Sequence, residues 1–171
     1  SKKGKKVFNG LLCVHKDSDI KTVQELHGKR MAFGNERSTI GRFLSQNYMY
    51  KHGVIARDLA TYDYLGRHDK VGAAVANGKY DVGAIKEGTF NKLVEGGAPL
   101  RQIASFTNVT KPWISRSGLP EEIYLAIKES LLNIKDGDVL KALKKDGFME
   151  GNDKDYARIR EAININYRFF E

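Results

Sequence analysis

Residues 30–41 read Arg-Met-Ala-Phe-Gly-Asn-Glu-Arg-Ser-Thr-Ile-Gly: a short apolar run, a polar turn and the start of a helical stretch. Helical spacing of apolar residues continues to about His52, and Gly53 is a suitable end for that helix. A strand, a turn and a helix therefore meet at Ser38, which is a good N-cap residue. Such a succession is the building unit of an α/β fold.

Residues 35–41, here called the Ser38 turn, have the features of an anion site. Free backbone N–H groups of Thr39, Ile40 and Gly41 would point outward, with the hydroxyls of Ser38 and Thr39 beside them. A helix start attracts phosphate-like groups through such donors and through the positive end of its dipole. Helix capping alone explains Ser38 equally well, so this segment in isolation leaves both interpretations open.

The alternation of strand and helix continues along the chain. We expect helices over residues 21–26, 39–52, 69–76 and 88–95, and strands over 7–16, 29–33, 60–65, 80–85 and 100–106. This pattern predicts an α/β sheet covered by helices on both faces. Ligands of such sheets bind beyond the carboxyl ends of the strands, where Ser38, His68 and Lys86 fall.

After residue 116 the pattern changes to helices alone, over residues 120–134, 138–145 and 153–167. Three helices without strands of their own need support, and a second lobe would provide it through connecting strands at 7–16 and 104–116. We therefore expect a complete α/β ligand-binding lobe over residues 17–106. Residues 1–16 and 107–171 would form hinge strands and the C-terminal helical part of the other lobe.

The composition favours an anionic partner but does not identify it. The 171 residues carry a net charge of +8, which attracts anions of any size. Nucleic-acid binding requires basic residues clustered with aromatic ones, whereas here they are scattered among acidic residues. The exception is the lysine-rich start at residues 2–6, which we interpret as a solvated terminus. The sequence predicts no nucleic-acid partner.

The residues that catalysis requires do not form a recognisable pattern. Four histidines lie far apart without an HxxxH or HxH pair, and Ser38 lies in no GxSxG elbow. The single cysteine, Cys13, sits in an apolar run and is expected to be buried. We predict a non-catalytic chain with no metal site, no catalytic residues and no cofactor.

Several motifs occur in a fixed order between residues 11 and 120. They are an apolar strand before Lys16-Asp-Ser-Asp-Ile20, the segment Glu25-Leu-His-Gly-Lys-Arg-Met-Ala-Phe-Gly34, Ser38-Thr39-x-Gly41, Arg67-His-Asp-Lys-Val71, Tyr80-Asp-Val-Gly-Ala84, and Lys111-Pro-Trp113 before Gly118-Leu-Pro120. In this order they resemble the PhnD-type phosphate, phosphite and phosphonate-binding proteins, the periplasmic substrate-binding components of ABC transporters.

The resemblance implies a type II periplasmic-binding-protein fold, in which two lobes close on a small oxyanion at a hinge. It implies one complete α/β lobe plus the C-terminal helical part of a second lobe. Roughly the first hundred residues of the family, which would supply most of one lobe and part of the pocket, would precede this chain. It also implies a periplasmic or extracytoplasmic location.

The resemblance assigns roles to the Ser38 turn and to His68. Ser38 and Thr39 match the hydroxyls that grip the phosphonate, and Gly41 completes the motif. Ile40 stands where the family often has a second serine, so only its backbone N–H remains. His68 matches a ligand-contacting histidine, although from the residues alone it could instead cap the helix that starts at Asp69.

Further candidates flank this turn. Arg37 and Arg42 could each bind two anion oxygens or simply be solvated. Tyr64 and Trp113 could line the cleft or only pack, and Lys86 follows a strand at the same edge.

The residues favour no single anion. Aminoethylphosphonate binders of the family use an acidic group near residues 110–112, where this chain has Lys111. That favours phosphate, phosphite or another compact oxyanion, although Glu87 could still supply a carboxylate.

Three functions remain open at this level. The first is capture of a phosphorus oxyanion for an ABC transporter permease. The second is a ligand-sensing domain of a sensor kinase, and the third, less favoured, is an enzyme on the same fold. A truncated lobe would expose apolar surface, which favours dimerisation or domain swapping.

Overall fold

The computed structural model describes residues 4–171. The chain divides into two compact units. Unit 1 includes Val109–Tyr156 together with the described residues before Asn9, and unit 2 includes Asn9–Asn108 and Ala157–Glu171.

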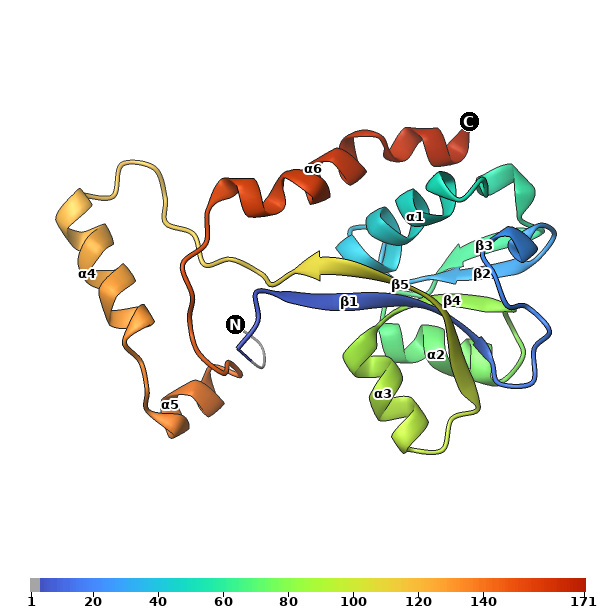
Figure 1. The fold of residues 1–171 in the computed structure, drawn as a ribbon, viewed down its shortest axis with the longest axis horizontal. Coiled ribbons are helices and arrows are strands. Elements are labelled where there is room, and N and C mark those ends of the chain that lie inside the picture. The colour runs from blue at the N-terminus through green and yellow to red at the C-terminus, as the bar shows by residue number, and fades with distance from the viewer. Residues whose placement is uncertain (1–3) are drawn as a thin grey trace. The chain divides into compact units, whose positions relative to one another are not determined.

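Five strands form the sheet at the centre of unit 2 (Figure 1): β1 (Val7–His15), β2 (Arg30–Phe33), β3 (Thr61–Tyr64), β4 (Val82–Lys86) and β5 (Leu100–Val109). Their order is β3-β2-β4-β1-β5. β2 runs parallel to β3 and β4, whereas β1 runs antiparallel to β4, with Leu12 opposite Ala84. β2, β3 and β4 therefore end at one edge, where the chain leaves each of them for a turn or helix.

Helices cover both faces of this sheet. α2 (His68–Ala76) and α3 (Glu87–Glu95) lie on one face, while α1 (Ser45–Lys51) and α6 (Ala157–Asn164) lie on the other (Figure 1). α1 continues a π-helical turn, η2 (Thr39–Leu44), and α6 is followed by a 3-10 segment, η5 (Asn166–Phe170). Two further 3-10 turns are η1 (Gln24–Leu26) and η3 (Ala56–Asp58). The predicted α/β class is confirmed.

The core of unit 2 depends on a close approach of α2 to β4. A Cβ atom at Gly83 would lie 2.7 Å from Val71 Cγ1, so only glycine allows this approach. Cys13, Val71 and Ile85 are completely buried in the resulting cluster. Burial raises the pKa of the Cys13 thiol to about 12, which keeps it protonated and unreactive. Its predicted role as a core residue is confirmed.

Unit 1 contains α4 (Glu121–Leu132), α5 (Gly137–Ala142) and the 3-10 turn η4 (Asp153–Tyr156). Neither α4 nor α5 has a buried residue. Polar contacts tie its segments together: Thr110 N donates to Lys6 O (2.7 Å), and the Tyr156 hydroxyl donates to Thr110 O (2.9 Å). Lys6 also pairs with Asp155 at 3.4 Å, whereas Lys2 and Lys3 of the lysine-rich start lie outside the described residues.

The unit boundaries differ from the sequence-based division. Residues 9–16 and 157–171 group with the lobe, and β5 ends at Val109 instead of running to residue 116. Residues 157–171 group with the lobe because the C-terminal segment is buried against it. Phe169 is 1% exposed, and its ring meets that of Phe33 edge to face at 5.9 Å.

Candidate functional site

The Ser38 turn rests on a contact between two glycines. Gly34, directly after β2, donates its N–H to Gly41 O at 2.8 Å. A Cβ atom at Gly41 would lie 2.7 Å from Gly34 Cα, so the backbones touch and neither position has room for a side chain. This contact places the first turn of η2 directly over the end of β2.

Ser38 is the N-cap of η2, as predicted. Its Oγ accepts a hydrogen bond from Gly41 N at 2.9 Å. Its carbonyl accepts from both Arg42 N (3.1 Å) and Phe43 N (3.2 Å), and the second of these bonds gives the turn its π-helical character. The expectation of three free amides is thus wrong for Gly41, because the capping hydroxyl occupies that N–H.

Two amides at the turn remain available. Thr39 and Ile40 open the helix, so their N–H groups have no carbonyl one turn earlier within η2, and the described residues offer them no other acceptor. The Ser38 hydroxyl accepts from Gly41 but can still donate its own hydrogen. Thr39 is half-buried and adds a second hydroxyl.

Ile40 contributes its backbone alone. Its side chain is 3% exposed, and a Cβ atom placed at Gly10 of β1 would lie 2.7 Å from Ile40 Cγ2. The isoleucine side chain therefore packs onto the sheet and contributes to the hydrophobic core.

His68 lies beside the same glycine contact. A Cβ atom at Gly34 would be 3.5 Å from His68 Cε1 and 3.6 Å from Gly66 O. His68 is the first residue of α2, and Arg67 occupies the N-cap position, so the alternative of a capping histidine is wrong. Within residues 4–171, His68 Nδ1 is a buried atom without a hydrogen-bond partner.

The electrostatics keep this imidazole neutral. Burial lowers the pKa of His68, the positive charge of Lys86 lowers it further, and a backbone hydrogen bond at Ala84 and the charge of Asp69 oppose the change. Lys86 is the last residue of β4, at the edge of the sheet where α2 begins with His68. Ser38 and His68, both expected at this edge of the sheet, thus lie on either side of the Gly34–Gly41 contact.

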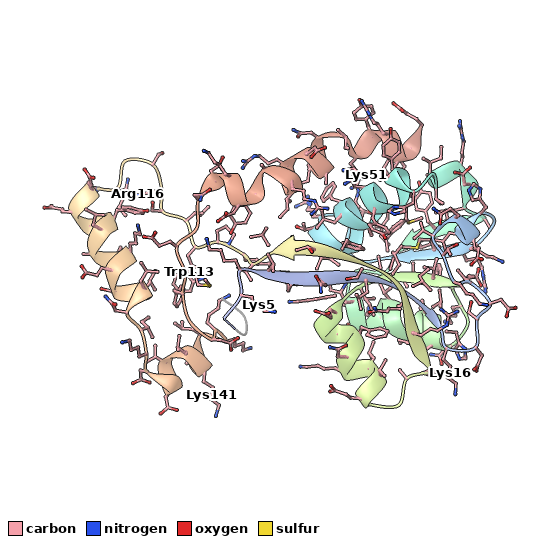
Figure 2. The ribbon with its side chains drawn as sticks, in the orientation of Figure 1. Lys5, Lys16, Lys51, Trp113, Arg116 and Lys141 are labelled. Carbon is pink, nitrogen blue, oxygen red and sulfur yellow. The ribbon has the colours of Figure 1, made fainter. Side chains whose placement is uncertain are left out.

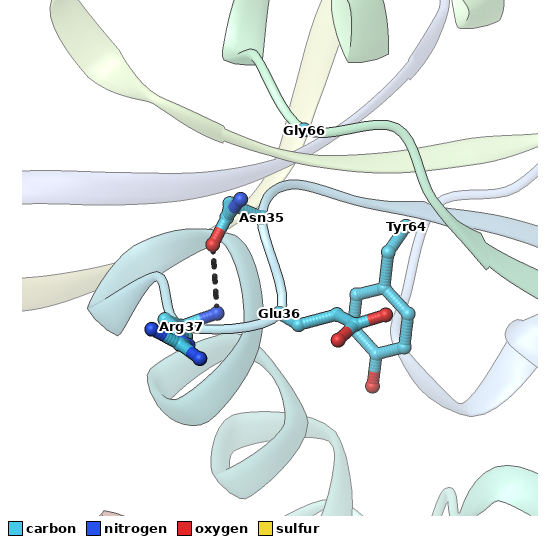
Figure 3. Close-up of a pocket in the computed structure, with 5 residues that line it drawn as sticks. All are labelled: Asn35, Glu36, Arg37, Tyr64 and Gly66. Carbon is cyan, nitrogen blue, oxygen red and sulfur yellow. Dashed lines mark hydrogen bonds between the residues drawn. The ribbon is translucent and has the colours of Figure 1, made fainter.

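An open hollow of about 340 Å³ adjoins the turn (Figure 3). It is lined by Asn35, Glu36, Arg37, Tyr64 and Gly66. Asn35 Oδ1 accepts from Arg37 N at 2.9 Å, which fixes the start of the turn. The Tyr64 hydroxyl accepts from Gln46 Nε2 at 2.9 Å, and burial raises its pKa. Tyr64 therefore contributes its ring and Arg37 an exposed cation to the rim.

Two other candidates have different surroundings. Arg42 donates from Nη1 to Glu36 O at 3.0 Å, and its guanidinium carbon lies 4.9 Å from the ring centre of Phe43. The Arg42 guanidinium therefore already has partners within the protein. Trp113 belongs to unit 1, where its ring packs edge to face on Phe148 at 4.9 Å, so it is not among the residues that unit 2 gathers at the turn.

Several residues near the turn were not predicted from the sequence. Gly34 and Gly66 look like ordinary turn glycines, and only the fold shows that Gly34 lies beside His68 and the Gly66 carbonyl. Gln46 and Asn166 are buried amides that bond to each other at 2.8 Å although 120 positions separate them. No spacing in the sequence signals a pair so distant.

Charge is spread over the surface of unit 2. Figure 2 shows Lys16 beyond the end of β1 and Lys51 at the end of α1, both exposed. Among residues 4–171, no three His, Cys, Asp or Glu side chains are placed to hold a metal ion. Over the same residues, no helix combines the length and apolar character that crossing a bilayer requires.

Comparison with known proteins places the chain in a family. Residues 1–156 match the family described as "ABC transporter, phosphonate, periplasmic substrate-binding protein". A protein of Prochlorococcus marinus (strain MIT 9301), named "Probable ABC transporter phosphite binding protein PhnD1", is 31% identical over 83 residues. Those residues are 47% of this chain and 28% of the relative, so the match spans under a third of that relative's length.

Two solved structures share the fold. PhnD1 from Prochlorococcus marinus in complex with methylphosphonate gives a TM-score of 0.81 at 21% identity, covering 98% of this chain and 70% of that one. XAC2383 from Xanthomonas citri bound to ATP gives 0.81 at 22% identity, covering 99% and 70%. The fold is thus that of the type II periplasmic binding proteins, and the predicted resemblance is confirmed. The chain belongs to the family of periplasmic phosphonate-binding proteins of ABC transporters.

Proposed function

We propose that this chain captures a small phosphorus oxyanion for an ABC transporter, with Ser38, Thr39, Ile40, Gly41 and His68 forming the half of the ligand site that lies in unit 2. The observation that carries the proposal is the start of η2. Two unpaired amides and two hydroxyls converge there, at the positive end of a helix. An anion with three or more oxygens matches this set of donors.

His68 suits the same ligand. Its neutral imidazole has one nitrogen that donates and one that accepts, so it can bond to a phosphoryl oxygen or to a protonated one. Lys86 and Arg37 add positive charge around the turn, in a chain whose net charge is +8. These charges raise the local concentration of anions.

The relatives narrow the ligand class. One carries phosphite binding in its name, and a structural neighbour holds methylphosphonate. We propose a compact anion of this kind, delivered to a membrane permease from a periplasmic location. We infer binding without catalysis, because the Ser38 hydroxyl accepts from the Gly41 amide and, among the described residues, is paired with no base that would make it a nucleophile.

The test separates helix capping from anion binding. Asp caps helices as well as Ser does, but it places a negative charge where the anion would sit. We expect Ser38→Asp to keep the helix and to abolish binding. In the wild-type chain, phosphite or methylphosphonate should shift the amide NMR resonances of Thr39 and Ile40.

Ser105→Ala, at an exposed serine of β5, is the control and should bind like the wild type. Ser38→Gly removes the hydroxyl at little cost to the cap and should bind more weakly. If Ser38→Asp retains wild-type shifts with either anion, the ligand binds elsewhere.

A further inference from the structure

A buried chain of hydrogen bonds links the C-terminal segment to the edge of the sheet. Asn166 Nδ2 in η5 donates to Gln46 Oε1 in α1 (2.8 Å), and Gln46 Nε2 donates to the Tyr64 hydroxyl in β3 (2.9 Å). Gln46 is completely buried and Asn166 is 6% exposed. A buried amide that is left without a hydrogen-bond partner destabilises the folded protein. These hydrogen bonds therefore fix one orientation for all three side chains.

A second link runs from the same segment through Arg42. The guanidinium carbon of Arg42 lies 5.7 Å from the ring centre of Tyr64 and 5.8 Å from that of Phe170. Arg42 Nε is buried without a hydrogen-bond partner in the described residues, so aromatic faces take the place of water around this cation. Its Nη1 bonds to Glu36 O, inside the Ser38 turn.

Both links end at the proposed anion site. Gln46 and Arg42 belong to the continuous helix that starts at Thr39, and Tyr64 and Glu36 line the hollow beside it. A third contact adds to these two links. Phe169 of η5 packs against Phe33, the residue before Gly34. The C-terminal segment therefore contacts the helix, the strand and the ring that surround the turn.

We propose that η5 is a positioning element for the Ser38 turn, in which Asn166 acts through Gln46 and Phe170 acts through Arg42. Neither Asn166 nor Phe170 is among the donors of the proposed site. The consequence for anion affinity rests on the function proposed above, whereas the consequence for the order of the turn does not.

Paired substitutions distinguish positioning from simple core stability. Asn166→Leu leaves Gln46 Oε1 buried without a partner and destabilises the chain. The double variant Gln46→Leu/Asn166→Leu removes both polar groups at similar volume, so most of the stability should return. If the chain of hydrogen bonds positions the turn, amide exchange at Ser38 and Gly41 should remain faster by about tenfold in the double variant. Phosphite should then bind about tenfold more weakly.

Asn164→Leu, at an exposed asparagine two residues away, is the matched control and should change neither readout. Phe170 is 41% exposed, so Phe170→Leu should fold even if the double variant does not. It should also speed exchange at Gly41, while Phe170→Tyr keeps the ring and restores the wild-type rate.

Wild-type exchange at Ser38 and Gly41 in a stable double variant, or in Phe170→Leu, overturns the proposal. A wild-type chain that binds no phosphite would refute the proposed function. The amide exchange rates of Ser38 and Gly41 would still test the positioning role of η5.

Discussion

At the residue scale, Ile40 belongs to the sequence motif of the ligand site, but its side chain is part of the hydrophobic core. In the family motif a serine often stands at this position, but the isoleucine side chain packs against Gly10 and is 3% exposed. We predict that Ile40→Ser lowers the free energy of unfolding by about 3 kcal/mol, because it opens a cavity and buries a hydroxyl. It should not tighten anion binding. Urea denaturation and phosphite titration measure the two effects.

The matched control is Ile114→Ser, at an isoleucine that is 87% exposed. Its effect on unfolding should stay within about 0.5 kcal/mol. Tighter phosphite binding by Ile40→Ser would mean that this side chain can turn toward the ligand.

His68 gives a prediction about pH. Burial lowers its pKa in the folded state, so the unfolded chain takes up a proton more readily than the folded chain does. The contribution of His68 to stability is therefore fully present above the ordinary histidine pKa of about 6.5. It declines as the pH falls from there toward the lower folded value. Asp69, whose pKa is lowered by Arg67, acts in a more acidic range.

Urea unfolding at several pH values between about 7 and 5 tests this prediction. We expect the loss of stability over that interval to be smaller in His68→Gln than in the wild type. Equal slopes in the wild type and His68→Gln would show that the buried ring is not the titrating group.

At the element scale, local signals were enough to predict most helices and strands. Ser38 is a strong N-cap and Gly53 a strong stop, so the helix expected over 39–52 is found as η2 and α1, Thr39–Lys51. Likewise the strands around Leu12, Ala32 and Ala84 are nearly uniform apolar runs, which identifies buried strands. The α/β class and the edge that carries Ser38, His68 and Lys86 followed from this pattern.

Long-range contacts could not be predicted in the same way. The π-helical first turn arises because Gly34 and Gly41 touch across the end of β2, and the resulting cap consumes the Gly41 amide. The return of η5 to the lobe depends on Phe169 and Asn166 finding partners more than a hundred positions earlier. Periodicity reports which face of an element is apolar, but not which other element covers it.

At the scale of the whole molecule, the two units differ in how much they bury. Unit 2 has a continuous apolar core on both faces of its sheet, built from residues such as Leu12, Phe33 and Val71. Unit 1 leaves large apolar side chains exposed along α4, namely Ile123, Tyr124, Leu125 and Ile127, each at least 43% exposed. Because burial of apolar area is the main source of stability, unit 1 should open at a much lower free-energy cost.

The single tryptophan makes this difference measurable. Trp113 lies in unit 1 against Phe148, whereas the β-sheet signal in far-UV circular dichroism comes from unit 2. We predict that the tryptophan fluorescence transition in urea precedes the circular dichroism transition, because the two probes follow units of unequal stability. Amides of α4 should accordingly exchange faster than those of β4. In a Trp113→Phe background, Tyr62→Trp moves the probe to β3, and its transition should then coincide with that of the sheet. Coincident transitions for Trp113 and the sheet would mean that the two units unfold as one cooperative body. The stability of α4 would then have to come from contacts other than those of its exposed apolar residues.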